Sequence, residues 1–175
     1  MVIDKSFDVA NKWTFQIPSI SRLLKRYVGN GIGWVDPFAG ETSPAEFTND
    51  INPSRPTKYH LYADEFCKTI EGNFNGVLFD PPYSYRQITE CYQDLNIRAS
   101  QLDTSANFYN RVMNAITPKI KLGGIAISFG WNSNGFGKSR GFRQLEILLV
   151  AHGMHHNDTI CVVEEKIYEQ QNLFD

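Results

Sequence analysis

The stretch Gly76-Val77-Leu78-Phe79-Asp80-Pro81-Pro82-Tyr83 is the most informative part of this chain. Its first four residues are apolar, which is typical of a buried strand in a parallel sheet. Two consecutive prolines cannot continue a strand, because proline lacks an N–H group and restricts the residue before it. The pattern therefore predicts a rigid corner at a strand tip, with the carboxylate of Asp80, the ring of Tyr83 and proline carbonyls free to accept hydrogen bonds. Asp-Pro-Pro is also a common structural turn, so the tetrapeptide alone fits either role.

Three further acidic residues follow strand-like segments upstream of this corner. Residues 33–40 contain a short apolar run, then Asp36 and a turn with Gly40, and two later runs end at Asp50 and Asp64. Open α/β sheets bind ligands outside the C-terminal ends of their strands. The repeated pattern therefore predicts one rim of the molecule lined with hydrogen-bond acceptors.

The apolar periodicity predicts an α/β fold that forms a single domain over residues 1–175. Helices are expected at 18–28, 86–96 and 105–119, and a clipped turn replaces a helix between Asp36 and Asp50. The expected strands alternate with these segments and favour a doubly wound sheet. They lie at 32–36, 46–50, 59–63, 76–80, 124–129, 144–151 and 159–165.

The composition excludes several classes of protein. A net charge of −2 gives no global basic field for nucleic acid, although local basic patches remain compatible with it. The three cysteines lack Cys-x-x-Cys spacing, which indicates free thiols in a reducing compartment. The sequence contains no signal-peptide pattern and no segment long enough to span a bilayer, so we expect a cytoplasmic protein without a membrane partner. His152, His155 and His156 lack the spacing of metal ligands, and we expect no metal.

Three segments resemble one enzyme family. Asp80-Pro81-Pro82-Tyr83 resembles the catalytic motif of S-adenosylmethionine-dependent amino-methyltransferases, which methylate adenine N6 or cytosine N4. Residues 36–40 resemble the cofactor loop of this family, although Thr42 and Ser43 stand where a second glycine is usual. Residues 15–20 resemble the N-terminal motif that packs over the methionine end of the cofactor. The order of the motifs resembles small phage-type adenine-specific DNA N6-methyltransferases.

This resemblance implies a Rossmann-like, mostly parallel sheet of seven strands with helices on both faces, in which residues 144–151 and 159–165 form a terminal pair. It also implies S-adenosyl-L-methionine as cofactor and S-adenosyl-L-homocysteine as product. By polarity, Asp50 is expected to accept hydrogen bonds from the ribose hydroxyls, Asp64 from the adenine amine, and Asp36 to attract the ammonium group. The alternatives are a turn residue at Asp50, a helix N-cap at Asp64, and a purely structural role for Phe15 and Pro18. The predicted cofactor-binding residues are Phe15, Pro18, Asp36, Pro37, Phe38, Ala39, Gly40, Asp50, Ile51, Asp64 and Glu65.

The predicted catalytic residues are Asp80, Pro81, Pro82 and Tyr83. Asp80 and the Pro81 carbonyl would accept the two N–H groups of an exocyclic amine and align its lone pair. Tyr83 would stack on the extruded base, a contact worth about 1–3 kcal/mol, which offsets part of the cost of base flipping. Most of the rate acceleration would then come from positioning.

Residues 131–143 combine glycines, aromatic residues and cations, a composition that favours a nucleic-acid-binding loop over an ordinary flexible surface loop. DNA is the expected partner, and RNA is not excluded. No separate target-recognition domain is evident, so specificity would come from residues 85–104 and this loop, from a homodimer or from a separate specificity subunit. The predicted nucleic-acid-binding residues are Trp131, Asn132, Asn134, Lys138, Arg140 and Arg143.

Three functions follow from these patterns. We favour a DNA adenine-N6 methyltransferase. The second possibility is an enzyme that acts on RNA adenine N6 or on DNA cytosine N4. The third is a relative without catalytic activity that binds the cofactor or nucleic acid.

Overall fold

The computed structural model describes residues 1–83, 106–153 and 157–168. The expected helix at 86–96, the proposed specificity segment 85–104, and His155 and His156 lie outside these ranges. Within them, the elements follow one another in the order β1 (Val2–Phe7), η1 (Thr14–Gln16), α1 (Pro18–Tyr27), β2 (Trp34–Asp36), β3 (Phe47–Thr48), α2 (Ala63–Thr69), β4 (Phe74–Phe79), α4 (Ala106–Ile116), η4 (Thr117–Lys119), β5 (Ile120–Gly130), η5 (Lys138–Arg140), β6 (Phe142–Ala151) and β7 (Thr159–Lys166).

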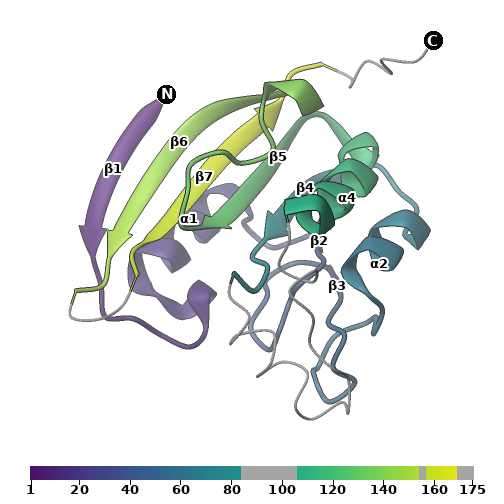
Figure 1. The fold of residues 1–175 in the computed structure, drawn as a ribbon, viewed down its shortest axis with the longest axis horizontal. Coiled ribbons are helices and arrows are strands. Elements are labelled where there is room, and N and C mark those ends of the chain that lie inside the picture. The colour runs from purple at the N-terminus through teal and green to yellow at the C-terminus, as the bar shows by residue number, and fades with distance from the viewer. Residues whose placement is uncertain (84–105, 154–156, 169–175) are drawn as a thin grey trace.

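The strands form one seven-stranded sheet in the order β1-β6-β7-β5-β4-β2-β3 (Figure 1). β7 is antiparallel to β5 and β6, and the other neighbouring pairs are parallel. The sheet therefore confirms the expected α/β class, with β6 and β7 as the antiparallel terminal pair. β4 lies inside the sheet between β2 and β5. The corner that follows it therefore lies near the middle of the side of the sheet at which β4 ends.

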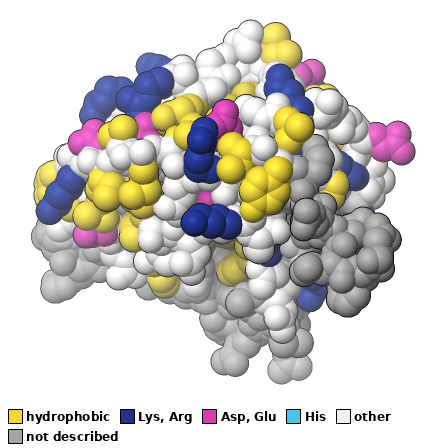
Figure 2. All heavy atoms as spheres, turned by 90° about the horizontal axis from the view of Figure 1, so that it is seen from above, with side chains coloured by type: hydrophobic (Ala, Val, Ile, Leu, Met, Phe, Trp, Pro, Cys, Tyr) yellow, Lys and Arg dark blue, Asp and Glu magenta, His cyan; other side chains and the backbone are white. Residues whose placement is uncertain are grey.

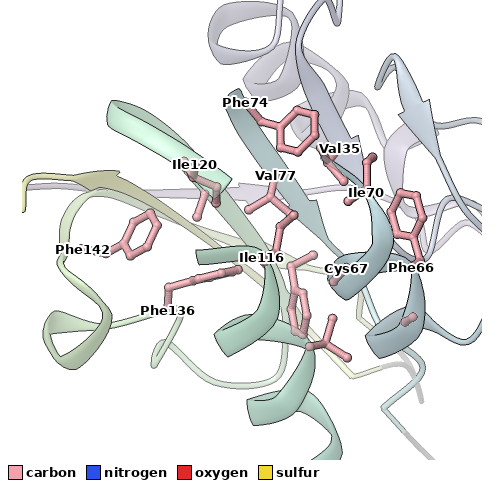
Figure 3. Packing of buried hydrophobic residues seen from close by; sticks show 14 residues of the cluster. Val35, Phe66, Cys67, Ile70, Phe74, Val77, Ile116, Ile120, Phe136 and Phe142 are labelled. Carbon is pink, nitrogen blue, oxygen red and sulfur yellow. The ribbon is translucent and has the colours of Figure 1, made fainter. Parts of the chain in front are cut away.

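Helices cover both faces of the sheet because successive strand residues point to opposite sides. Val77 of β4 packs in a cluster with residues of α2 and α4, and Figure 3 shows side chains of these elements meeting there. The neighbouring Leu78 packs on the other face, in a cluster with Leu23 and Leu24 of α1. α1 begins with Pro18 at its first turn, where the missing N–H costs nothing, and it buries one apolar stripe as expected.

The structure corrects two expected strands and adds one that was not expected. Residues 59–63 do not form a strand; Tyr59 makes one isolated bridge to Asn49. The Asn49 side chain replaces a ladder there, because its amide nitrogen donates to the carbonyls of Pro37 and Leu61 and its oxygen accepts from the Leu61 N–H. The strand expected at 46–50 is reduced to the two residues of β3. β1 was not expected, because Asp4 and Lys5 interrupt its apolar pattern.

Other features agree with the sequence. The chain between Asp36 and β3 contains turns and no helix. Cys67 and Cys161 are buried free thiols, as predicted, and Cys91 lies outside the described residues. Among the helices of the described ranges, none has the length and apolar character needed to cross a membrane.

Candidate active site

The corner Asp80–Tyr83 directly follows β4, whose last residue, Phe79, pairs with Ser128 of β5. Pro81 is buried, whereas Asp80 and Tyr83 are partly buried. Burial raises the pKa of the Asp80 carboxyl to about 6, while the nearby Thr14 hydroxyl favours the charged form. Asp80 is therefore a carboxylate at neutral pH that can accept hydrogen bonds at a strand tip.

Tyr83 packs in a small aromatic group. Its ring centroid lies 5.9 Å from that of Trp131 and 6.4 Å from that of Tyr109. Gly130 gives the ring room, since a Cβ at this position would lie 2.9 Å from a Tyr83 ring carbon. These neighbours hold Tyr83 beside the C-terminal end of β5.

The two proline carbonyls of the corner differ. The Tyr109 hydroxyl donates a hydrogen bond to the Pro82 carbonyl, a side-chain donor that the sequence did not indicate. The reason is tertiary packing, because α4 brings Tyr109 to the corner. No donor within the described ranges contacts the Pro81 carbonyl, which leaves Asp80 and this carbonyl as an available pair of acceptors.

Asp36 braces the loop that follows β2. The residue is fully buried, and its carboxylate accepts hydrogen bonds from the Phe38 N–H at 2.9 Å and from the Ser43 hydroxyl at 2.6 Å. Burial raises its pKa to about 7. Ser43, one of the residues that departs from the family pattern, thus closes the loop by a side-chain hydrogen bond instead of by close glycine packing.

Asp50 joins this loop to the end of β3. Its carboxylate accepts from the Gly40 N–H at 3.2 Å and from the Asn52 N–H at 2.8 Å, and burial raises its pKa. Gly40 has a φ of 56° and lies against the ring of Trp13, where an added Cβ would be 3.4 Å from a ring carbon. The negative charges of Asp80 and Asp50 both raise the pKa of Asp36, so three of the four carboxylates expected on one rim lie near one another, and Asp64 is not among them.

The apolar residues predicted for the cofactor site also belong to the core. Phe38 packs edge-on against Phe79, with ring centroids 5.5 Å apart, and Phe15 packs on Phe129 at 5.1 Å. Pro37 and Ala39 are buried, Ile51 is partly buried, and Pro18 is exposed at the start of α1. The contact with Phe129 therefore supports the alternative that Phe15 has a structural role.

Asp64 and Glu65 lie in the first turn of α2, whose N-cap is Tyr62. Neither the strand end nor the N-cap expected for Asp64 is present, because residues 59–63 form no strand and the helix already begins at Ala63, with Tyr62 as its N-cap. Asp64 forms ion pairs with Lys68 at 3.1 Å and with Arg111 at 3.7 Å, and Glu65 is exposed. Two cations thus already occupy the region of the Asp64 carboxylate.

The predicted nucleic-acid loop is divided between two parts of the molecule. Trp131, Asn132 and Asn134 are exposed beside the corner, where β5 ends. Arg143 instead lies on β6 opposite Glu165, which pairs with Ile125 of β5. That position is five residues before Gly130, or about 16 Å along the strand.

The middle of the loop is fixed to the core. The Glu164 carboxylate accepts from the N–H groups of Phe136 and Gly137, and Phe136 is buried. Arg140 donates to Asn110 and Asn114 of α4, and Arg143 forms an ion pair with Glu165. Figure 2, which views the molecule from above Figure 1, shows Lys and Arg side chains in separate places among acidic and hydrophobic ones. Lys138, Arg140 and Arg143 therefore do not join Asp80 in one site.

Two further features lie apart from the corner. His152 is buried and follows the end of β6. Its ring nitrogens lie 2.9 Å from the carbonyl of Asp8, which follows β1, and 2.9 Å from the hydroxyl of Thr159, which begins β7. The described residues contain no group of three His, Cys, Asp or Glu side chains that could hold a metal. A shallow hollow beside α2 contains none of the predicted site residues and is lined by Phe47, Tyr59, Leu61, Phe66, Thr69, Ile70 and Glu71.

The sequence did not indicate the contributions of Trp13, Thr14, Ser43 and Tyr109. Ser43 follows Asp36 by seven residues in the same loop, so its short distance in sequence could have indicated their hydrogen bond. Tyr109 lies 27 residues beyond Pro82, and no local pattern could connect the two. Trp13 and Thr14 reach the site because the chain returns to this edge after β1.

Comparisons with known proteins place the fold. No family model matches the chain, and no curated protein matches it by sequence. TrmN from Thermus thermophilus is similar in structure, with a TM-score of 0.58 and 13% identity over 87% of this chain and 49% of TrmN, so this chain spans about half the length of that protein.

A second solved structure is similar to the same extent. It is the Burkholderia thailandensis 1,6-didemethyltoxoflavin-N1-methyltransferase with bound 1,6-didemethyltoxoflavin and S-adenosylhomocysteine. The TM-score is 0.58 and the identity 11%, over 85% of this chain and 76% of that one. This chain therefore shares the Rossmann-like sheet of these two proteins, and its proline-locked carboxylate, Asp80, follows the C-terminal end of β4.

Proposed function

We propose that this protein transfers a methyl group from S-adenosyl-L-methionine to the exocyclic N6 amine of adenine in DNA. The observation that carries the proposal is the convergence of Asp36, Asp50 and Asp80, with Tyr83 near Asp80, at the edge where open α/β sheets bind ligands. The structural likeness to a methyltransferase supports methyl transfer in general, and the resemblance of residues 80–83 to the amino-methyltransferase motif supports an amine as acceptor.

The residues around the β2 loop fit the cofactor. Each Asp50 oxygen accepts one backbone hydrogen bond, and a carboxylate has about four acceptor positions, so capacity remains for ribose hydroxyls. Residues 37–40 present backbone beside Asp50, and the partly exposed Gly40 carries no side chain to block a close approach. When bound, S-adenosyl-L-methionine supplies a positively charged sulfonium with a transferable methyl group.

The acceptor amine needs positioning more than deprotonation. The lone pair of an aromatic amine is delocalised into the ring, so the nitrogen must move toward tetrahedral geometry before it reacts. Asp80 and the Pro81 carbonyl accept one N–H each and stabilise that geometry. The nitrogen lone pair then forms the new N–C bond, the electrons of the broken C–S bond remain on sulfur, and the surplus proton leaves the nitrogen through Asp80 or solvent.

Nucleic acid would approach over the exposed end of β5. Trp131 lies beside Tyr83 with its side chain exposed, and Asn132 and Asn134 follow it. An aromatic surface with amide groups suits an unstacked base and its edges. We therefore keep Trp131, Asn132 and Asn134 as proposed nucleic-acid contacts, and we assign no such role to Lys138, Arg140 and Arg143.

Transfer of the tritiated methyl group tests the proposal. The protein is incubated with S-adenosyl-L-methionine labelled in the methyl group and either unmethylated genomic DNA or total RNA, and the products are digested to nucleosides. N6-methyladenine in DNA is the expected product. Label in RNA adenine or at cytosine N4 would replace the proposed substrate by the alternative ones. Binding of the cofactor without any transfer would contradict enzymatic function.

Replacement of the corner carboxylate provides the matched variant. Asp80→Ala is expected to abolish transfer, because the amine loses its charged acceptor, while cofactor binding measured by calorimetry stays within about twofold. Transfer at the wild-type rate in this variant would refute the role of Asp80.

A further inference from the structure

Tyr109 of α4 contacts two residues of the corner and the last residue of β4. Its hydroxyl donates to the Pro82 carbonyl, its ring packs at right angles to Phe79 with centroids 6.3 Å apart, and it lies 6.4 Å from Tyr83. It therefore touches the residue before Asp80-Pro81-Pro82, the last residue of that segment and the residue after it. Within the described ranges, no other aromatic ring packs against both Phe79 and Tyr83.

The support behind Tyr109 is rigid. Val112 and Ile116, on the following turns of α4, are fully buried in the same cluster as Val77 and Phe79 of β4. The helix is therefore fixed to the strand that ends in the corner. Burial raises the pKa of the Tyr109 hydroxyl to about 12, so the group keeps its proton and remains a donor at neutral pH.

The hydrogen bond has a consequence for the acceptors at the site. An exocyclic amine brings two N–H groups, and the corner holds three acceptors: the Asp80 carboxylate and the carbonyls of Pro81 and Pro82. The Tyr109 hydroxyl takes one of the two acceptor positions of the Pro82 carbonyl, whereas no donor in the described ranges contacts the Pro81 carbonyl, so Asp80 and Pro81 are the less engaged acceptors. The same bond fixes the Pro82–Tyr83 peptide, and with it the direction in which the Tyr83 side chain leaves the backbone.

We propose that Tyr109 is a positioning residue, which holds the Pro82 carbonyl and thereby sets the acceptor pair and the ring orientation that the substrate amine meets. This role rests on the proposed methyl transfer and adds to it a residue outside the recognised motifs. It predicts that loss of the Tyr109 hydroxyl alone slows the chemical step, although the residue does not touch the substrate.

The test compares two Tyr→Phe variants that lose the same type of bond. Tyr109→Phe removes the hydroxyl and keeps the ring. Tyr168→Phe is the matched control, because the Tyr168 hydroxyl also donates to a backbone carbonyl, that of Lys138, in the part of the loop away from the corner. For each variant, kcat and KM are measured with tritiated S-adenosyl-L-methionine and genomic DNA, with the melting temperature and the calorimetric Kd for the cofactor.

The expected result is a fall in kcat of about tenfold for Tyr109→Phe, the scale of one lost positioning hydrogen bond. The Kd for the cofactor stays within about twofold, and Tyr168→Phe keeps the wild-type kcat. Wild-type kcat in Tyr109→Phe would overturn the inference, as would equal losses in both variants or a weaker cofactor affinity with unchanged kcat. A wild-type protein that transfers no methyl group would instead refute the proposed function, and this role with it.

Discussion

Asp36 and Glu164 are both buried carboxylates that hold a loop, but only Asp36 belongs to the candidate site. Asp36 accepts from the Phe38 N–H and the Ser43 hydroxyl, and Glu164 accepts from the N–H groups of Phe136 and Gly137. Burial raises the pKa of both. Their charged neighbours differ, because Arg140 lowers the pKa of Glu164, whereas the carboxylates of Asp80 and Asp50 raise that of Asp36.

This difference separates a structural carboxylate from a site. The charge of Glu164 is compensated by a guanidinium group of the protein. In the described part of the chain, no cation is among the groups that shift the pKa of Asp36, and its acidic neighbours make its ionisation more costly, an arrangement that costs folding free energy. A buried, hydrogen-bonded carboxylate thus does not indicate a functional site by itself. The charge of the neighbouring groups distinguishes the two cases.

The largest expected effect comes from neutralising one carboxylate in the candidate site, Asp80, and comparing it with the structural carboxylate Glu164. Asp80→Asn should lower methyl transfer by at least about 100-fold, because the amine loses a preorganised charged acceptor. Glu164→Gln should leave the specific activity of the folded protein within about threefold and lower its unfolding free energy by about 1–3 kcal/mol. Transfer assays and urea unfolding measure the two quantities. Equal losses of activity in both variants would remove the distinction between the two carboxylates.

Gly135→Ala probes the loop held by Glu164. Gly135 has a φ of 57°, and a Cβ there would lie 2.2 Å from a carboxylate oxygen of Glu164. Both strain and the clash should lower the unfolding free energy by about 1–3 kcal/mol, with unchanged cofactor affinity. Gly29→Ala is a useful control, because Gly29 has a φ of 62° and no atom within 4 Å of its added Cβ. A smaller loss in Gly135→Ala than in Gly29→Ala would contradict the tight contact with Glu164.

The pKa values of Asp36 and Asp80 are raised to about 7 and about 6. They predict that the unfolding free energy falls as the pH rises, whereas the rate of methyl transfer increases. Both groups bind protons more strongly in the folded state than in the unfolded chain, where an Asp titrates near about 4. Their contribution to stability is therefore present at low pH and is lost as the pH rises from about 4 to 7. Methyl transfer should rise through about pH 6 as Asp80 ionises.

Urea unfolding of the protein without cofactor and initial transfer rates, both from pH 5 to 8, check this prediction. Asp36→Asn should flatten the decline in stability between pH 5 and 8, since it removes the group with the higher pKa. A decline of the same size in that variant would show that Asp36 does not titrate as described.

The smallest effects concern the two ends of the segment 131–143. Trp131→Ala should raise the KM for DNA about tenfold, because an exposed ring beside Tyr83 is lost. Arg143→Gln should leave that KM unchanged and alter the unfolding free energy by less than about 0.5 kcal/mol, because its ion pair with Glu165 is exposed on the Arg143 side. A higher KM in Arg143→Gln would extend the DNA surface to the far end of the loop.

The features that the sequence predicted correctly are those set by local residues. Apolar runs bounded by turns located the inner strands, and the two prolines after Asp80 required a corner whatever the rest of the chain did. Asp36 and Asp50 were placed at one edge because parallel strands end at the same side. Here a few neighbouring residues decide the conformation.

The features that it missed depend on contacts between distant segments. Residues 59–63 look like a strand, but the Asn49 side chain takes both backbone groups of Leu61, and only an isolated bridge at Tyr59 joins the sheet. The cations of residues 138–143 look continuous with Trp131, but Glu164 draws the middle of the loop across the sheet. Tyr109 reaches Pro82 through the packing of α4. None of these partners could be read from spacing alone.

A crystal structure with S-adenosyl-L-homocysteine bound tests the central claim most directly. Our account predicts that the ligand lies along residues 36–40, with its ribose at Asp50 and its sulfur facing the corner of Asp80 and Tyr83. The ligand in the hollow between Phe47 and Ile70, or a protein that takes up none of it at millimolar concentration, would contradict the account.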